Sequence, residues 1–218
     1  MEATVTAATV KPLLRGWTHL VSFPLMVVFG TLLIVALTPP AGRVPVAVYV
    51  GGTAVMFGVS ALYHRVRWQP RARALMQKFD HSAIYLAIAG GYTPVAVVCL
   101  EGWWRLGMLL AAWIGAAVGI LLHWLPHVPR AVRAASYIAL GWVAVLAVPQ
   151  MNWVLGPAGI VLILLGGVAY TVGAACFATK RPDPWPSVFG YHEVFHAFTV
   201  LAATLQFVGI AVAVVPHF

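Results

Sequence analysis

Seven long runs of apolar residues, separated by short polar stretches, make up nearly the whole chain. A bilayer core takes about 20 apolar residues per helix, and each run is close to that length. The pattern therefore predicts seven membrane-spanning helices, with Gly, Pro and charged residues marking the connections between them. The expected spans cover residues 17–37, 44–64, 81–100, 105–124, 133–149, 157–178 and 191–215.

Composition excludes an ordinary soluble domain. Hydrophobic residues make up 62% of the chain, charged residues only 8%, and the mean hydropathy is +0.92. Soluble domains carry roughly 25% charged residues, so this chain has too few charges to cover a water-facing surface. We expect an all-α integral membrane bundle, in which residues 1–15 form a short cytoplasmic N-terminus and residues 16–218 form a single seven-helix domain.

The basic residues are divided unevenly between the two ends of the expected bundle. The chain has 13 Lys and Arg residues and a net charge of +8, and all of them except Arg43 and Arg105 fall in connections on one side. Because the cytoplasmic side retains Lys and Arg, this predicts a cytoplasmic N-terminus and an external C-terminus in the cell membrane. Basic residues confined to short loops, including the stretch 65–78, indicate contact with membrane lipids rather than with nucleic acid.

Three histidines are expected at the cytoplasmic end of the bundle. His192 and His196 are four residues apart, which places both imidazoles on one face of the seventh span. His64 ends the second span and completes a set of three nitrogen ligands, which together with a water make a tetrahedral zinc site. The alternative is that each histidine is a core residue, hydrogen-bonded to a neighbouring helix.

Two further residues indicate hydrolytic chemistry. Asp80 begins the third expected span, and Ser60 lies one turn before His64 on the same helical face. A carboxylate beside zinc can accept a proton from a water that the metal activates. We therefore expect Asp80 to be a general base and Ser60 to hydrogen-bond the water or an oxyanion.

Glu193 offers a competing general base. The run from His192 to His196 matches H-E-x-x-H, the metalloprotease helix whose glutamate is the base. Glu193 lies about 100° around the helix from His192, however, so it can equally face water or pair with Lys180 or Arg181. We expect the loss of Asp80, rather than of Glu193, to abolish activity.

Five short motifs, read together, resemble those of a known family. They are Thr18-His19, Ser60-x-x-x-His64, Asp80-His81, Tyr92-Thr93-Pro94 and His192-x-x-x-His196. In these the chain resembles the hemolysin III group of bacterial membrane proteins, which is related to progestin and adiponectin receptors and, more distantly, to alkaline ceramidases. The resemblance implies seven spans with the N-terminus inside, zinc on the three histidines, and a catalytic water near Asp80 and Ser60.

One departure from that family lies just before the first span. The family usually has Glu and Asn seven and four residues before the first-span histidine, where this chain has Pro12 and Arg15. We therefore expect His19 to line the cytoplasmic mouth without binding metal. His81 and His123 are likewise expected to reach the interface or a loop rather than a metal.

Three functions remain open. The first is a zinc-dependent hydrolase acting on a lipid amide or ester. The second is a non-enzymatic sensor or regulator of membrane state, in which zinc holds the second and seventh spans together. The third, pore-forming lysis, ranks last because the spans predict a closed apolar bundle. A retinal protein is excluded, since the expected seventh span has no lysine to form a Schiff base.

Overall fold

A computed structural model describes residues 11–37 and 40–217, so residues 1–10 of the expected cytoplasmic N-terminus lie outside the described residues. Within that part the chain is helical, and seven segments are long and apolar enough to cross a membrane. This confirms the all-α prediction. The long helices are α1 (Trp17–Ala36), α2 (Arg43–Arg65), α3 (Pro70–Cys99), α4 (Gly102–Trp124), α5 (Arg130–Trp142), α6 (Val148–Thr179) and α7 (Tyr191–Val214).

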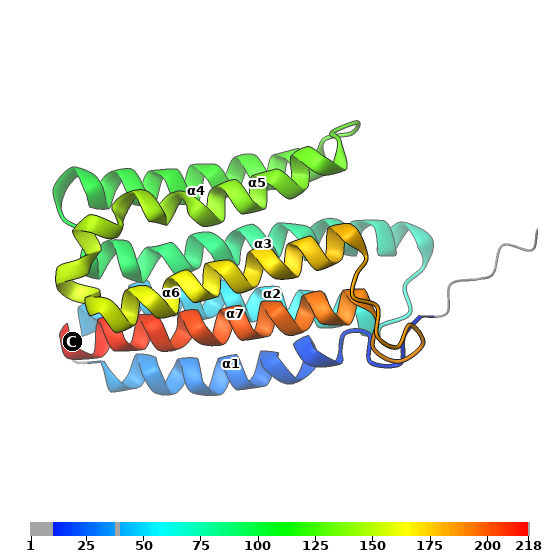
Figure 1. Cartoon of the computed structure of the whole chain (residues 1–218), viewed down its shortest axis with the longest axis horizontal. Helices are drawn as coiled ribbons and strands as arrows, with labels where there is room; N and C mark the ends of the chain where they lie inside the picture. The colour runs from blue at the N-terminus through cyan, green and yellow to red at the C-terminus, as the bar shows by residue number, and fades with distance from the viewer. Residues whose placement is uncertain (1–10, 38–39, 218) are drawn as a thin grey trace, which may run out of the picture.

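The helices lie side by side in one bundle (Figure 1). α2 packs against α1 and α3, α3 also packs against α4, and α6 packs against α7. α2 and α3 are the most buried spans, whereas α5 and α6 expose most of their surface. Because the exposed faces carry Leu, Val, Ile and Phe, the outer helices present the apolar surface that lipid contact requires.

One end of the bundle gathers the start of α1, the α2–α3 connection and the α6–α7 connection (Figure 1). We call it the N-terminal end. It carries all of the described Lys and Arg side chains except Arg43 and Arg105. The described C-terminal residues lie at the opposite end.

α3 begins well before the apolar run that predicts it. The expected span starts at residue 81, whereas the helix starts at Pro70, so the expected solvated stretch 65–78 is mostly helical. Proline is favoured at the first helical position, and the Ala, Arg, Leu, Met and Lys residues that follow have high helix propensity. Hydropathy detects only the apolar part of such a helix. Asp80 therefore lies within α3 rather than at its start.

The chain also stays helical across the expected break at residues 152–157. A short 3₁₀ helix, Val143–Ala147, leads from α5 into α6, and α6 bends at Gly156, where φ is +61°. Only glycine adopts that conformation without strain, and Pro157 follows it. The turn between the fifth and sixth spans is therefore a glycine bend inside a helical segment.

α2 and α3 approach each other closely enough for their backbones to touch. A Cβ added at Gly52 would lie 2.6 Å from the Leu86 carbonyl oxygen, and one at Gly90 would lie 3.0 Å from the Val48 carbonyl oxygen. Small residues allow such contacts between membrane helices. This contact fixes how the candidate site residues on α2 face those on α3.

Gly52→Ala is expected to lower the thermal stability of the purified protein, at a cost of about 1–3 kcal/mol, because the added methyl group overlaps the Leu86 carbonyl. Gly51→Ala is the matched control, since a Cβ there meets nothing within 4 Å. Alanine has the higher helix propensity, so the control should be as stable as the parent or slightly more so. Equal melting temperatures for the two variants would contradict the close contact.

Candidate metal centre

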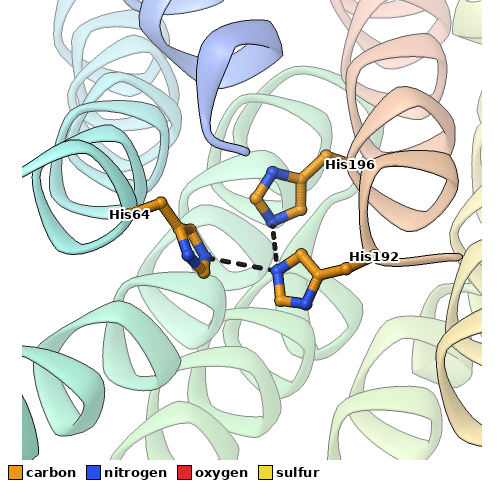
Figure 2. Close-up of side chains that lie close together, drawn as sticks. All are labelled: His64, His192 and His196. Atoms are coloured by element: carbon orange, nitrogen blue, oxygen red, sulfur yellow. Dashed lines mark hydrogen bonds between the residues drawn. The ribbon is translucent and has the colours of Figure 1, made fainter. Parts of the chain in front are cut away.

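Three histidine side chains meet at the N-terminal end of the bundle. His64 comes from α2, and His192 and His196 come from α7, with their rings turned toward one another (Figure 2). The Nε2 atom of His192 lies 3.2 Å from Nε2 of His64 and 3.0 Å from Nε2 of His196. One potential ligand atom from each residue lies within 4.8 Å of the others. We call these residues the three-histidine cluster.

The cluster fits a tetrahedral metal ion. Nitrogen ligands about 2.0–2.1 Å from zinc at tetrahedral angles are separated by roughly 3.3 Å, which is close to the two Nε2 distances in the structure. A proton on His192 Nε2 can satisfy one of its two contacts, because that nitrogen carries a single hydrogen or a single in-plane lone pair. A cation among the three nitrogens satisfies all of them.

Local capping interactions set the start of α7 and so the position of its two histidines. The backbone N–H of Gly190 donates to Glu193 Oε2 at 2.9 Å, and that of Tyr191 donates to Asp183 Oδ1 at 2.8 Å. Carboxylates at a helix N-terminus satisfy free amides and oppose the helix dipole. A Cβ at Gly190 would lie only 2.7 Å from Asp183 Oδ1, so glycine makes room for both carboxylates.

Ser60 and Asp80 lie at the same end of the bundle as the cluster. Ser60 is buried one turn before His64 on α2, so the two side chains share a face of that helix. The Ser60 hydroxyl lies close to the carboxylate of Asp80 on α3. The structure thus brings the serine and the aspartate together at the end of the bundle that holds the three imidazoles.

Glu193 is paired, but with neither residue that the sequence indicated. Its carboxylate is 1% exposed and forms a salt bridge with the Arg15 guanidinium, while its second oxygen caps α7. The sequence had left Glu193 free either to face water or to pair with Lys180 or Arg181. The structure shows neither arrangement, because the chain before α1 crosses this end of the bundle and brings Arg15 to the first turn of α7.

Residues 11–16, the N-terminal segment, form one wall of the site. The backbone N–H groups of Leu13 and Leu14 donate to the carbonyls of Ser187 and Val188 at 2.9 and 3.0 Å. The Lys11 ammonium donates to the His64 carbonyl. Partial burial and, next, the charge of Arg65 lower the pKa of Lys11. The segment therefore ties the end of α2 to the start of α7.

His19 lies deeper than expected. Rather than lining an open mouth, it is 3% exposed, and its ring stacks on that of His196 with centroids 3.9 Å apart and planes 3° apart. His127 is exposed in the α4–α5 connection. Sequence spacing did not indicate that His19 stacks on His196, because the two residues are far apart along the chain.

A second set of polar residues is packed between α3, α4 and α5. His123 is buried in the last turn of α4, where its Nε2 lies 2.9 Å from the Tyr137 hydroxyl and its Nδ1 lies 3.2 Å from the Gly119 carbonyl. The Tyr137 hydroxyl also lies 3.1 Å from the His81 carbonyl. His81 and His123 therefore pack within the bundle instead of reaching a loop, and neither belongs to the three-histidine cluster.

Comparison with known protein families identifies the group to which this chain belongs. The family described as "Haemolysin-III related" matches residues 7–207. The chain belongs to the hemolysin III family. Hemolysin-3 of Bacillus cereus is 32% identical to it over 165 residues, which is 74% of this chain and 71% of the relative.

More distant relatives extend beyond bacteria. The Hemolysin-3 homolog of Bacillus subtilis (strain 168) is 29% identical over 150 residues, covering 68% of this chain and 67% of that protein. The monocyte to macrophage differentiation factor of Homo sapiens is 27% identical over 168 residues, covering 75% and 67%. The hemolysin III resemblance of the five motifs is thus confirmed over most of the chain.

Arg15→Met is expected to lower the thermal stability of this hemolysin III protein, because it leaves the buried Glu193 carboxylate without its partner, at a cost of about 3–5 kcal/mol. In the double variant Arg15→Met/Glu193→Gln no charge is left unpaired, and glutamine can still cap α7. The double variant should therefore melt at a higher temperature than Arg15→Met alone.

Arg181→Met is the control, since Arg181 is exposed in the α6–α7 connection. Its melting temperature should match that of the parent. An equal loss in Arg181→Met and Arg15→Met, or no loss in either, would contradict a structural role for the pair.

Proposed function

We propose that this hemolysin III protein is a zinc-dependent hydrolase of the cell membrane that cleaves a lipid amide or ester bond. The observation that carries the proposal is the convergence of the Nε2 atoms of His64, His192 and His196 in a largely buried environment. Three protein ligands leave the fourth tetrahedral position to water or substrate, which is the pattern of catalytic rather than closed structural zinc sites.

The surrounding residues fit the parts of a hydrolytic site. A zinc ion held by the cluster supplies a Lewis acid that polarises a carbonyl and lowers the pKa of a bound water to about 7. Asp80 accepts the proton from the attacking water, and Ser60 holds the Asp80 carboxylate in place. Glu193 is not free to act as the base, because Arg15 and the Gly190 amide occupy its two oxygens.

The purified protein is expected to contain about one zinc ion per chain, because three imidazoles and one water complete a tetrahedral site. His64→Ala, His192→Ala and His196→Ala should each lower the zinc content measured by elemental analysis. His127→Ala, which alters an exposed histidine of the α4–α5 connection, should keep it. Protein prepared without chelators that contains no zinc would rule the metal out.

Asp80→Asn is expected to retain zinc but to lose activity by about 10² to 10⁴, the usual effect of removing a general base. The assay is release of a fluorescent leaving group from a panel of acyl amides and acyl esters in detergent. Glu193→Gln should keep turnover per folded molecule. Glu101→Gln is the control, because Glu101 lies between α3 and α4 at the far end of the bundle.

The opposite pattern, with Glu193→Gln inactive and Asp80→Asn near normal, would identify Glu193 of the H-E-x-x-H motif as the general base. Full turnover by both zinc-loaded variants would exclude both carboxylates as the base, whereas a zinc-loaded parent without turnover on any substrate of the panel would contradict the hydrolase.

A structural zinc remains the second candidate function, and one observation favours it. α2 and α7 have few direct contacts with each other, so a metal on His64, His192 and His196 would link two helices that otherwise meet mainly through their neighbours. Zinc would then hold a sensor or regulator of membrane state together. Zinc removal should unfold such a protein, whereas a catalytic zinc leaves the bundle folded.

Pore formation, which the names of the Bacillus relatives suggest, is supported less well by the structure than either zinc-based function. The described interior is a continuous apolar cluster that runs through α2, α3 and α7 and includes Tyr49, Phe57 and Ile210. A water-filled channel needs a polar lining. The buried histidines are instead gathered at one end of the bundle.

A further inference from the structure

The rings of the three-histidine cluster are covered on the sides that face the rest of the bundle. The His196 ring stacks on that of His19, with centroids 3.9 Å apart, and the centroid of the His192 ring lies 5.2 Å from that of Phe177. Farther from the N-terminal end, the described interior is a continuous apolar cluster. Because an ion enters apolar surroundings only at a very high cost in free energy, a metal ion has to reach the histidines from the water at the N-terminal end.

At that end, the N-terminal segment lies directly against His64. A Cβ added at Gly16 would lie only 2.7 Å from the His64 Cβ, so any larger residue would push the backbone away. Gly16 has a φ of +81°, which glycine adopts without strain. At the other end of the segment, the Lys11 ammonium donates to the His64 carbonyl. Both ends of the segment are therefore attached to the last turn of α2.

The middle of the segment reaches the other side of the cluster. The backbone N–H groups of Leu13 and Leu14 donate to carbonyls of the α6–α7 connection at 2.9 and 3.0 Å, and the two stretches lie beside each other in Figure 1. Arg15 pairs with the buried Glu193 in the first turn of α7. Since α2 and α7 have few direct contacts with each other, the segment bridges the ends of the two helices that carry the three imidazoles.

This attachment is polar, so it can open without unfolding the bundle. Leu13 is 68% exposed and Leu14 is 37% exposed, so neither leucine anchors the segment in the core. Segments with few buried apolar contacts open locally at a fraction of the free energy of global unfolding. The pair of Arg15 and Glu193 is the strongest single contact, because both groups are charged and the carboxylate is buried.

We propose that the N-terminal segment is a latch on the metal centre: release of Arg15 from Glu193 opens the aqueous route to the three-histidine cluster, and a metal ion enters and leaves through that open state. The latch rests on the proposed function for its metal, but it does not require turnover. A latch sets the rates of metal entry and release together. It leaves the equilibrium affinity unchanged, because the ligands are the same whichever way the ion arrives.

The test is the exchange of bound zinc for an enriched zinc isotope, followed by elemental mass spectrometry on the purified, zinc-containing protein in detergent. Arg15→Met/Glu193→Gln removes the ion pair without changing the net charge or leaving a buried charge unpaired. It should exchange zinc about tenfold faster than the parent, the effect of losing one hydrogen bond between charged groups. Its zinc affinity, measured in a series of chelator-buffered zinc solutions, should stay within about threefold of the parent.

Arg105→Met/Glu101→Gln is the matched control, because it removes the same two kinds of charge at the opposite end of the bundle. Its exchange rate should equal that of the parent. Lys11→Met gives a second, milder variant, which loses only the contact with the His64 carbonyl and should exchange zinc about threefold faster. Its control is Lys180→Met, which removes an exposed cation of the α6–α7 connection and should leave the exchange rate unchanged.

The latch is overturned if Arg15→Met/Glu193→Gln and Lys11→Met exchange zinc at the parent rate, or if the purified parent holds no zinc. Faster exchange with a proportional loss of affinity would also overturn it, because the segment would then position the ligands instead of covering them. The hydrolase and the latch can fail separately. Faster exchange at equal affinity in a protein without turnover removes only the hydrolase, and turnover with exchange rates that ignore the segment removes only the latch.

Discussion

The arrangement of this end of the bundle depends on three imidazole nitrogens that converge on one point away from bulk water. The Nε2 atoms of His192 and its two neighbours are 3.0 and 3.2 Å apart, and ring protons cannot satisfy both contacts at once. A cation among them would turn mutual repulsion of lone pairs into ligation. Asp80 and Ser60, at the same end of the bundle, would then have the proposed roles of a base and of its hydrogen-bonding support.

The surrounding fold holds these nitrogens from three directions. The backbone contact at Gly52 sets α2 against α3, so that the histidine on α2 and the aspartate on α3 keep a fixed relation. The N-terminal segment binds the end of α2 through Lys11 and the first turn of α7 through Arg15. Glu193, which by its sequence motif resembles the base of a metalloprotease, is part of this support, because it pairs with Arg15 and caps α7. Residues before the first span thus contribute to a site whose candidate ligands all lie after it.

Much of this organisation could be predicted from the sequence, because the signals are local. Apolar runs predict the seven spans, and the spacing of His192 and His196 places both on one helical face. The early start of α3 was missed because a polar, Arg-rich helix has no hydropathy signal. The contact of Arg15 with Glu193, the stacking of His19 on His196 and the burial of His123 were also missed. The first two join residues from opposite ends of the chain, and nothing in the local sequence records which distant helix faces which.

X-ray absorption at the zinc edge of the purified protein tests the central claim most directly. If the three-histidine cluster holds a catalytic ion, the spectrum should show about four nitrogen or oxygen ligands at roughly 2.0 Å, with outer-shell scattering from about three imidazoles. His64→Ala should reduce the imidazole scattering among the ions that remain bound. A zinc coordinated by sulfur, or by light atoms without imidazole scattering, would contradict the account.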